Sequence, residues 1–108
     1  MKMIGRAVRA AVKIERKKHH DKGELRVIEK SELFDGEWYK KTYLQHEHID
    51  PARHFMLKGW KLGYNPSPWF CTNDYLARYH DIRDAQVNPL YHYETVGKGE
   101  FRNIQCVR

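Results

Sequence analysis

Residues 48–70 read HIDPARHFMLKGWKLGYNPSPWF, and residues 88–102 read NPLYHYETVGKGEFR. Both stretches contain Asp or Asn followed by Pro, then two residues, His, an aromatic residue, three residues and Gly. With a shift of 38 residues, the matching positions are Asp50 and Asn88, Pro51 and Pro89, His54 and His92, and Gly59 and Gly97. With a shift of 36 residues, Phe34, Tyr39 and Tyr43 match Phe70, Tyr75 and Tyr79. Self-similarity at a fixed spacing is typical of repeat proteins, so the sequence predicts two tandem units.

Each unit is predicted to be a pair of short helices. An Asx-Pro pair favours a helix start, because Asx caps the free first-turn amides and Pro has no amide to leave unpaired. Gly59 and Gly97 then end their helices as left-handed residues, a conformation that glycine adopts without strain. His54 and His92 lie between, and we expect each imidazole to hydrogen-bond a loop carbonyl. The NPSP segment at 65–68 separates the units, since Pro disfavours helix in the residue before it.

Composition limits the class of protein. The chain has 108 residues, 41% hydrophobic and 31% charged, which suits one small domain and excludes a large enzyme fold with its own cofactor cleft. It has no apolar run of the roughly eighteen residues that a membrane span needs, and its N-terminus lacks the apolar region of a secretory signal. Cys71 and Cys106 are expected to be reduced thiols in a cytoplasmic protein.

The excess positive charge is confined to the N-terminus. Residues 1–22 hold eight Lys and Arg against two acidic residues, whereas the rest of the chain is neutral. Small apolar residues recur at helical spacing from Ile4 to Val12, so the sequence predicts a basic amphipathic helix. Its basic positions are Lys2, Arg6, Arg9, Lys13, Arg16 and Lys17. This arm could bind anionic lipid, bind nucleic-acid phosphates or simply be solvated, and its lack of aromatic residues to stack on bases makes nucleic acid the less favoured partner.

The expected fold class is all-α, with a basic N-terminal helix followed by two short helical-hairpin repeats. We assign residues 1–30 to the basic amphipathic arm, 31–66 to the first repeat and 67–108 to the second. All fourteen aromatic residues lie between Phe34 and Phe101, so residues 31–108 are expected to form one compact domain in which the hairpins bury shared aromatic side chains.

The order of motifs resembles a known module. Residues 33–66 read LFDGEWYKKTYLQHEHIDPARHFMLKGWKLGYNP, and residues 69–103 read WFCTNDYLARYHDIRDAQVNPLYHYETVGKGEFRN. Both are similar to the pattern LFDxxYYLxxYPDVxxxxxDPLxHYLxxGxxEGRxP of tandem modules that lie beside glycosyltransferase domains in bacterial cell-surface polysaccharide biosynthesis proteins. The first unit lacks the Asp-Val element. The second has Cys71 at the first Asp position, where Thr72 is expected to cap the helix instead, and Phe101 at a Gly position.

The resemblance implies a biological setting and not a reaction. It implies a non-catalytic interaction module of capsule-type or O-antigen-type polysaccharide biosynthesis, with a glycosyltransferase or another polysaccharide-assembly protein as partner. Together with the missing secretory signal, it indicates a cytoplasmic protein, peripheral at the inner membrane if the arm binds lipid. The alternative is a small basic nucleic-acid-binding protein that uses the N-terminal helix.

Candidate site residues are few. Trp60, Tyr64 and Trp69 are the candidates for a surface that contacts a glycan or a partner, although large aromatic residues usually fill the core of a small domain. The chain has no GxSxG motif, no Gly-rich phosphate loop, no Cys-based zinc spacing and no evident nucleophile–base pair, so we expect no catalytic residue, no enzyme activity and no cofactor. Hydrogen bonds and helix caps explain the histidines and the acidic run that begins at Asp74 more simply than a metal site does.

Overall fold

The computed structural model describes residues 22–45 and 47–107. Residues 22–30 are helical and are followed by α2 (Gly36–Tyr43), α3 (Pro51–Leu57) and the 3-10 helix η1 (Gly59–Leu62). After a linker come α4 (Thr72–Arg78), α5 (His80–Ala85), α6 (Pro89–Thr95) and the 3-10 helix η2 (Gly97–Glu100). No described residue lies in a β-strand, because Ser67 and Phe70 form only an isolated bridge. The expected all-α class is therefore confirmed for this part of the chain.

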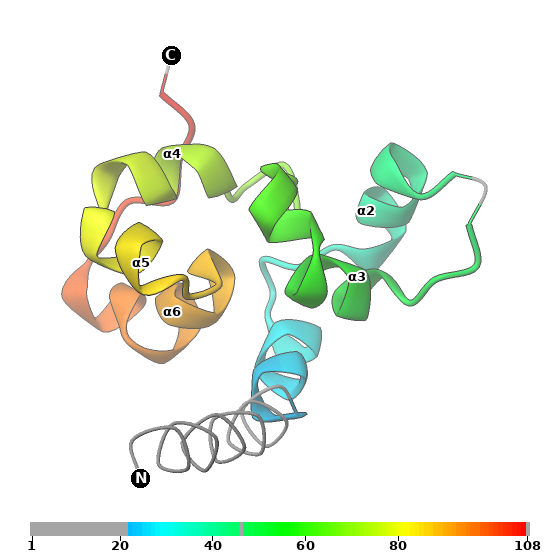
Figure 1. The fold of residues 1–108 in the computed structure, drawn as a ribbon, viewed down its shortest axis with the longest axis horizontal. Coiled ribbons are helices and arrows are strands. Elements are labelled where there is room, and N and C mark those ends of the chain that lie inside the picture. The colour runs from blue at the N-terminus through cyan, green and yellow to red at the C-terminus, as the bar shows by residue number, and fades with distance from the viewer. Residues whose placement is uncertain (1–21, 46, 108) are drawn as a thin grey trace, which may run out of the picture.

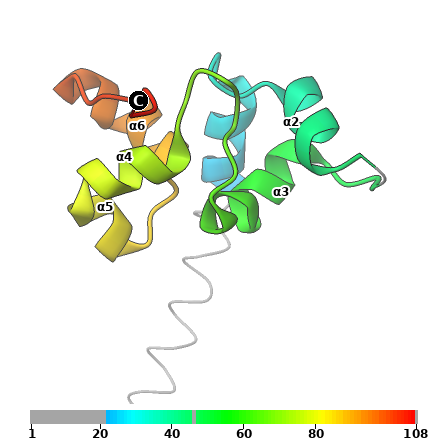
Figure 2. The ribbon, with the colours of Figure 1, turned by 90° about the horizontal axis from the view of Figure 1, so that it is seen from above.

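The helices form two groups that lie side by side. In Figure 1, α2 and α3 lie on one side of the molecule, and α4, α5 and α6 lie on the other. Figure 2 shows the same two groups from above, with the linker between them arching over the top. A single buried cluster includes side chains from both groups, among them Tyr39, Phe55, Phe70 and Tyr75, together with Ile28 from the helix at 22–30. Within the described ranges, no helix has the length and apolar character needed to cross a bilayer.

Local sequence sets the start of three helices. The Asp35 carboxylate accepts a hydrogen bond from the Trp38 amide at 3.0 Å and caps α2. Asp50 caps α3, and Asn88 caps α6, where its side-chain oxygen accepts from two amides. Pro51 and Pro89 are the first residues of their helices, so the predicted Asx-Pro starts are confirmed.

The fourth cap differs from the prediction. Cys71 is the N-cap residue of α4 and makes no side-chain capping bond there. Thr72 does not cap either, because it is already the first helical residue and its buried hydroxyl has no hydrogen-bond partner. The side-chain oxygen of Asn65 in the linker instead accepts from the Thr72 amide at 2.9 Å. The first turn of α4 is therefore capped by a linker residue, Asn65, and not by a residue at the N-terminus of the helix.

The prediction that Gly59 and Gly97 are left-handed helix stops is wrong. Neither has positive φ, and each is the first residue of a 3-10 helix in which the chain continues to turn. The left-handed residues are Gly63, Gln86 and Phe101, at φ 85°, 58° and 57°. Gly59 and Gly97 are required for a different reason, because a Cβ on either would collide with a buried tyrosine hydroxyl, that of Tyr39 or Tyr75 respectively.

The expectation of free thiols is also wrong, because Cys71 and Cys106 form a disulfide with a Cα–Cα distance of 5.1 Å. The chain brings them together by returning to the start of α4. The Cys71 amide donates to the Ile104 carbonyl at 2.8 Å, just as the Asp35 amide donates to the Pro66 carbonyl at 2.9 Å. The C-terminal tail is thus the counterpart of the linker, and its pairing with residue 71 places Cys106 within bonding reach.

Candidate functional site

The two histidines of the shared pattern belong to matching polar pairs. His54 Nδ1 lies 2.7 Å from the Tyr39 hydroxyl, and His92 Nδ1 lies 2.8 Å from the Tyr75 hydroxyl. Each pair joins the first helix of its group to the later one, α2 to α3 and α4 to α6. The prediction that each imidazole bonds a loop carbonyl is wrong. Each imidazole instead bonds a tyrosine hydroxyl on the helix that packs against it.

These pairs are not poised for acid–base chemistry. Burial raises the pKa of Tyr39 and Tyr75 far above the neutral range, so both phenols stay protonated. Burial lowers the pKa of His54 and His92, which keeps both imidazoles uncharged at neutral pH. A neutral phenol bonded to a neutral imidazole stabilises helix packing and supplies no activated nucleophile.

Each group has a second matching tyrosine, Tyr43 or Tyr79, which bonds the segment that follows the last helix of that group. The Tyr43 hydroxyl accepts from the Asn65 amide at 3.1 Å, and the Tyr79 hydroxyl accepts from the Asn103 amide at 2.7 Å. The ring of Tyr43 is covered by Tyr64, with centroids 4.0 Å apart and planes within 5° of parallel. In the other group the Arg102 guanidinium takes that place, 4.6 Å from the Tyr79 ring. Positions 36 or 38 residues apart thus make matching contacts, even where the side chains differ.

The three aromatic candidates for a binding surface do not share one environment. Trp60 is only 6% exposed and belongs to the buried cluster, so it cannot act as a surface platform. Tyr64 is half-buried and stacks on Tyr43 and His54. Trp69 is 59% exposed. Of the three, Trp69 alone offers a large free aromatic face.

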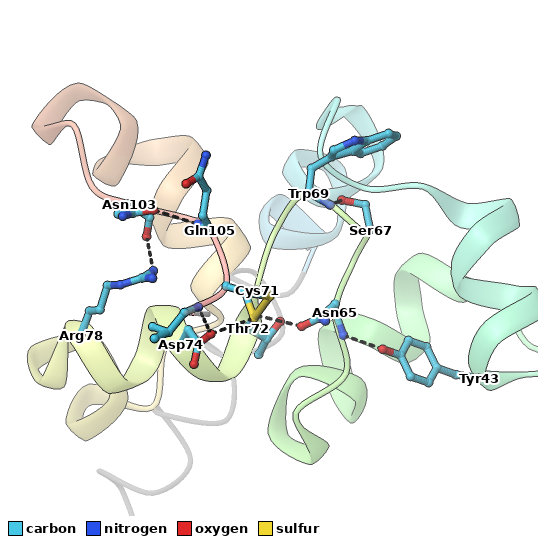
Figure 3. The surroundings of a disulfide bond; sticks show 12 residues. Tyr43, Asn65, Ser67, Trp69, Cys71, Thr72, Asp74, Arg78, Asn103 and Gln105 are labelled. Carbon is cyan, nitrogen blue, oxygen red and sulfur yellow. Dashed lines mark hydrogen bonds between the residues drawn. A yellow bond between two sulfur atoms is a disulfide. The ribbon is translucent and has the colours of Figure 1, made fainter.

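Trp69 lies at a groove between the linker and the C-terminal tail. The groove has a volume of about 680 Å³ and is lined by Pro68, Trp69, Ile104, Gln105 and Cys106. In Figure 3, the side chains of Trp69 and Gln105 stand on the same side of the disulfide, from two neighbouring segments. A groove lined by an indole and a carboxamide offers one stacking surface and one hydrogen-bonding group, which are features of sites that bind a polar molecule with an apolar face.

A second groove is lined by residues of α4, α5 and η2, and three of its charged side chains are paired with one another. Arg102 forms ion pairs with Asp81 at 3.3 Å and with Glu100 at 2.9 Å. These carboxylates neutralise the positive charge of Arg102, which would otherwise attract an anion. Phe101 lies at its edge and is 93% exposed.

Among the described residues, one group of side chains has the composition and spacing of metal ligands. It consists of Cys71, Asp74 and Cys106, whose ligand atoms all lie within 4.8 Å of one another. No zinc motif was recognisable in the sequence, because Cys71 and Asp74 are separated from Cys106 by more than thirty positions. The acidic run that begins at Asp74 was the sole hint, since it includes one member of the group.

Comparison with known proteins adds no relative from which to transfer a function. No protein-family model, no curated protein and no solved structure matches this chain. The candidate site is therefore defined by the geometry of the described residues alone.

Proposed function

We propose that this protein is a non-catalytic interaction module of bacterial cell-surface polysaccharide biosynthesis, built from two helical repeats, and that it contacts a sugar polymer through the groove at Trp69. The observation that carries the proposal is the 59% exposed indole of Trp69 in a groove that Gln105 also lines. A sugar ring has an apolar face that stacks on an indole and hydroxyls that a carboxamide can bond.

Two features support the polysaccharide setting. The chain resembles the tandem modules that accompany glycosyltransferases over the residues of both pattern units. The positions that define the pattern also make matching contacts, because Tyr39, His54 and Gly59 meet in one group as Tyr75, His92 and Gly97 meet in the other. These pattern residues serve packing, which leaves the exposed groove as the place for recognition.

The absence of catalysis is part of the proposal. The repeated Tyr–His pairs hold neutral side chains, and in the second groove Arg102 is ion-paired with Asp81 and Glu100. A glycosyltransferase partner would supply the chemistry. Pure protein supplied with nucleotide sugars and divalent metal should release no nucleotide diphosphate above a blank, and measurable turnover would contradict this part of the proposal.

The binding test uses a series of variants at Trp69. The full-length oxidised chain is titrated with purified capsular polysaccharides and O-antigen chains, with binding followed by calorimetry. Trp69→Ala should weaken binding by about 1–3 kcal/mol, the typical loss when an aromatic anchor is truncated, whereas Trp69→Phe should retain part of it. Leu62→Ala, at an exposed apolar residue outside the groove, is the matched control and should bind like the parent. Equal binding by Trp69→Ala and the parent would contradict the proposed groove.

Membrane attachment is a further component of the proposal. The basic residues from Lys2 to Lys17 lie outside the described residues, and the proposal for them rests on their charge and helical spacing. We infer a protein that is peripheral at the inner membrane, where lipid-linked glycans are assembled; the Cys71–Cys106 disulfide removes the support that free thiols would have given to a cytoplasmic location. The nucleic-acid alternative predicts a preference for DNA over anionic vesicles at the same salt concentration.

A further inference from the structure

We propose that Cys71, Asp74 and Cys106 form a redox-controlled binding site for Zn²⁺, which the disulfide closes and reduction opens. The site does not depend on sugar binding, although Cys106 also lines the groove at Trp69. Figure 3 shows Cys71 and Asp74 at the start of α4, with the disulfide to Cys106 lying between α4 and the tail.

The Cys71 sulfur and the Asp74 carboxylate already have nearly the separation that a zinc ion requires, whereas the two sulfurs are bonded to each other in the disulfide. All three ligand atoms lie within 4.8 Å of one another, and Cys71 Sγ lies 3.3 Å from Asp74 Oδ2. In a tetrahedral site with Zn–S near 2.3 Å and Zn–O near 2.1 Å, neighbouring ligand atoms are about 3.4–3.8 Å apart. Once the S–S bond is broken, modest side-chain rotations bring the two sulfurs to that separation.

The tail is held in place by bonds other than the disulfide. On the near side of Cys106, the Cys71 amide donates to the Ile104 carbonyl at 2.8 Å. On the far side, the Val107 amide donates to Asp74 Oδ2 at 2.7 Å. The Asn103 amide adds a bond to the Tyr79 hydroxyl at 2.7 Å. Reduction therefore leaves Cys106 facing Cys71, and the site is organised before a metal arrives.

The donor set selects the metal. Two thiolates with one carboxylate favour Zn²⁺ over Mg²⁺ or Ca²⁺, which prefer sets made of oxygen alone. Asp74 Oδ2 accepts from the Val107 amide, and because a carboxylate oxygen has two lone pairs, the same oxygen can also contact the ion. Because Cys106 is exposed, water can occupy the fourth coordination position.

The two states interconvert by a balanced exchange. A dithiol reductant gives two electrons to the disulfide, so the S–S bond breaks, two cysteine thiols form and the dithiol becomes a disulfide. Zn²⁺ then displaces the two thiol protons and binds the thiolates. In the reverse direction, an oxidised dithiol accepts two electrons from the two thiolates and two protons from water, the Cys71–Cys106 bond re-forms and Zn²⁺ leaves.

The test is metal titration of the full-length chain in both redox states. One sample is reduced with dithiothreitol and freed of it by gel filtration under nitrogen, while the other stays oxidised. Each is titrated with Co²⁺, whose thiolate charge-transfer absorption reports sulfur ligation, and then with Zn²⁺, which should displace Co²⁺ at one equivalent. The reduced chain should show this absorption, and the oxidised chain should not.

Variants test each ligand separately. Cys106→Ser should lose most of the thiolate absorption, and Asp74→Asn should weaken Zn²⁺ binding by on the order of tenfold or more. Asp84→Asn, at an exposed carboxylate on α5, is the matched control and should bind Zn²⁺ like the reduced parent. Far-UV circular dichroism checks that the reduced chain keeps its helices or regains them with Zn²⁺.

Three results would overturn the proposal: no thiolate absorption in the reduced parent, equal Zn²⁺ affinity in the two redox states, or equal affinity in Asp74→Asn and the parent. Zinc bound at surface histidines would appear in both redox states without thiolate absorption, so it falls under the first two of these results.

Discussion

Replacement of Gly59 by Ala tests the packing account of the shared glycine. Because φ at Gly59 is not positive, the backbone itself tolerates alanine. The added Cβ would instead overlap the Tyr39 hydroxyl, and the ring carbon that bears the hydroxyl would lie 3.2 Å away. A left-handed stop and a close approach thus predict different effects of the same substitution.

The expected loss of stability has two sources. Overpacking a buried contact by one methyl group costs about 1–3 kcal/mol. Displacing the Tyr39 hydroxyl also breaks its hydrogen bond to His54, and a buried polar group left unpaired costs about 1–3 kcal/mol. Replacing Gly by Ala returns about 0.4–1 kcal/mol through the unfolded chain, so the free energy of unfolding should fall by about 1–5 kcal/mol. Gly97→Ala should cost less, because its Cβ would lie 2.5 Å from the Tyr75 hydroxyl.

The decisive assay is a double-mutant cycle with Tyr39→Phe, measured by urea denaturation of the oxidised chain. Removing the hydroxyl removes the main obstacle, so Gly59→Ala should cost less than about 1 kcal/mol in the Tyr39→Phe background. Gly99→Ala is the matched control, since a Cβ there has no neighbour within 4 Å. If Gly59→Ala costs the same with Tyr39 and with Phe, the close approach is not the reason for the glycine, and the packing argument is refuted.

Three further results are expected. Asn65→Ala should lower the free energy of unfolding by about 1 kcal/mol through loss of the cap on α4, whereas Asn103→Ala, whose side chain bonds only within the exposed tail, should change it by less than about 0.5 kcal/mol in urea melts. Stability should fall as pH drops below about 6.5, because the pKa values of His54 and His92 are lower in the folded state than in the unfolded chain, and the unfolded state therefore binds more protons. Urea melts from pH 8 to 5 should show constant stability and then a decline. His92→Gln should make this decline smaller. Removing residues 1–21 should abolish sedimentation with anionic vesicles and leave the melting temperature within a few degrees of the parent, since the buried aromatic cluster lies entirely in later residues.

Features that depend on neighbours in sequence could be predicted. Asp50 and Asn88 cap helices that start at Pro51 and Pro89, because capping needs only the next few amides. The all-α class followed from the same local patterns. The helix α5 was missed, because its N-cap residue, Tyr79, makes no side-chain capping bond and the sequence there carries no start signal.

Features that depend on contacts between distant segments could not be predicted from local patterns. The collision at Gly59 involves a tyrosine twenty positions earlier, and the disulfide joins residues separated by 35 positions. The sequence did contain a signal for the Tyr39–Gly59 contact, because Tyr, His and Gly recur together in both units, which could have indicated that the three residues touch. For Trp60 and Trp69, residue type alone could not separate the buried indole from the exposed one.

The central claim, recognition of a sugar polymer by a non-catalytic module, is tested most directly by one partition experiment. The parent chain and Trp69→Ala are equilibrated, at one salt concentration, with immobilised bacterial surface polysaccharide, with anionic vesicles and with duplex DNA. We expect the parent to bind the polysaccharide, Trp69→Ala to lose this binding, and both proteins to bind the vesicles equally. Retention of the parent by DNA alone, or polysaccharide binding that is unchanged in Trp69→Ala, would contradict it.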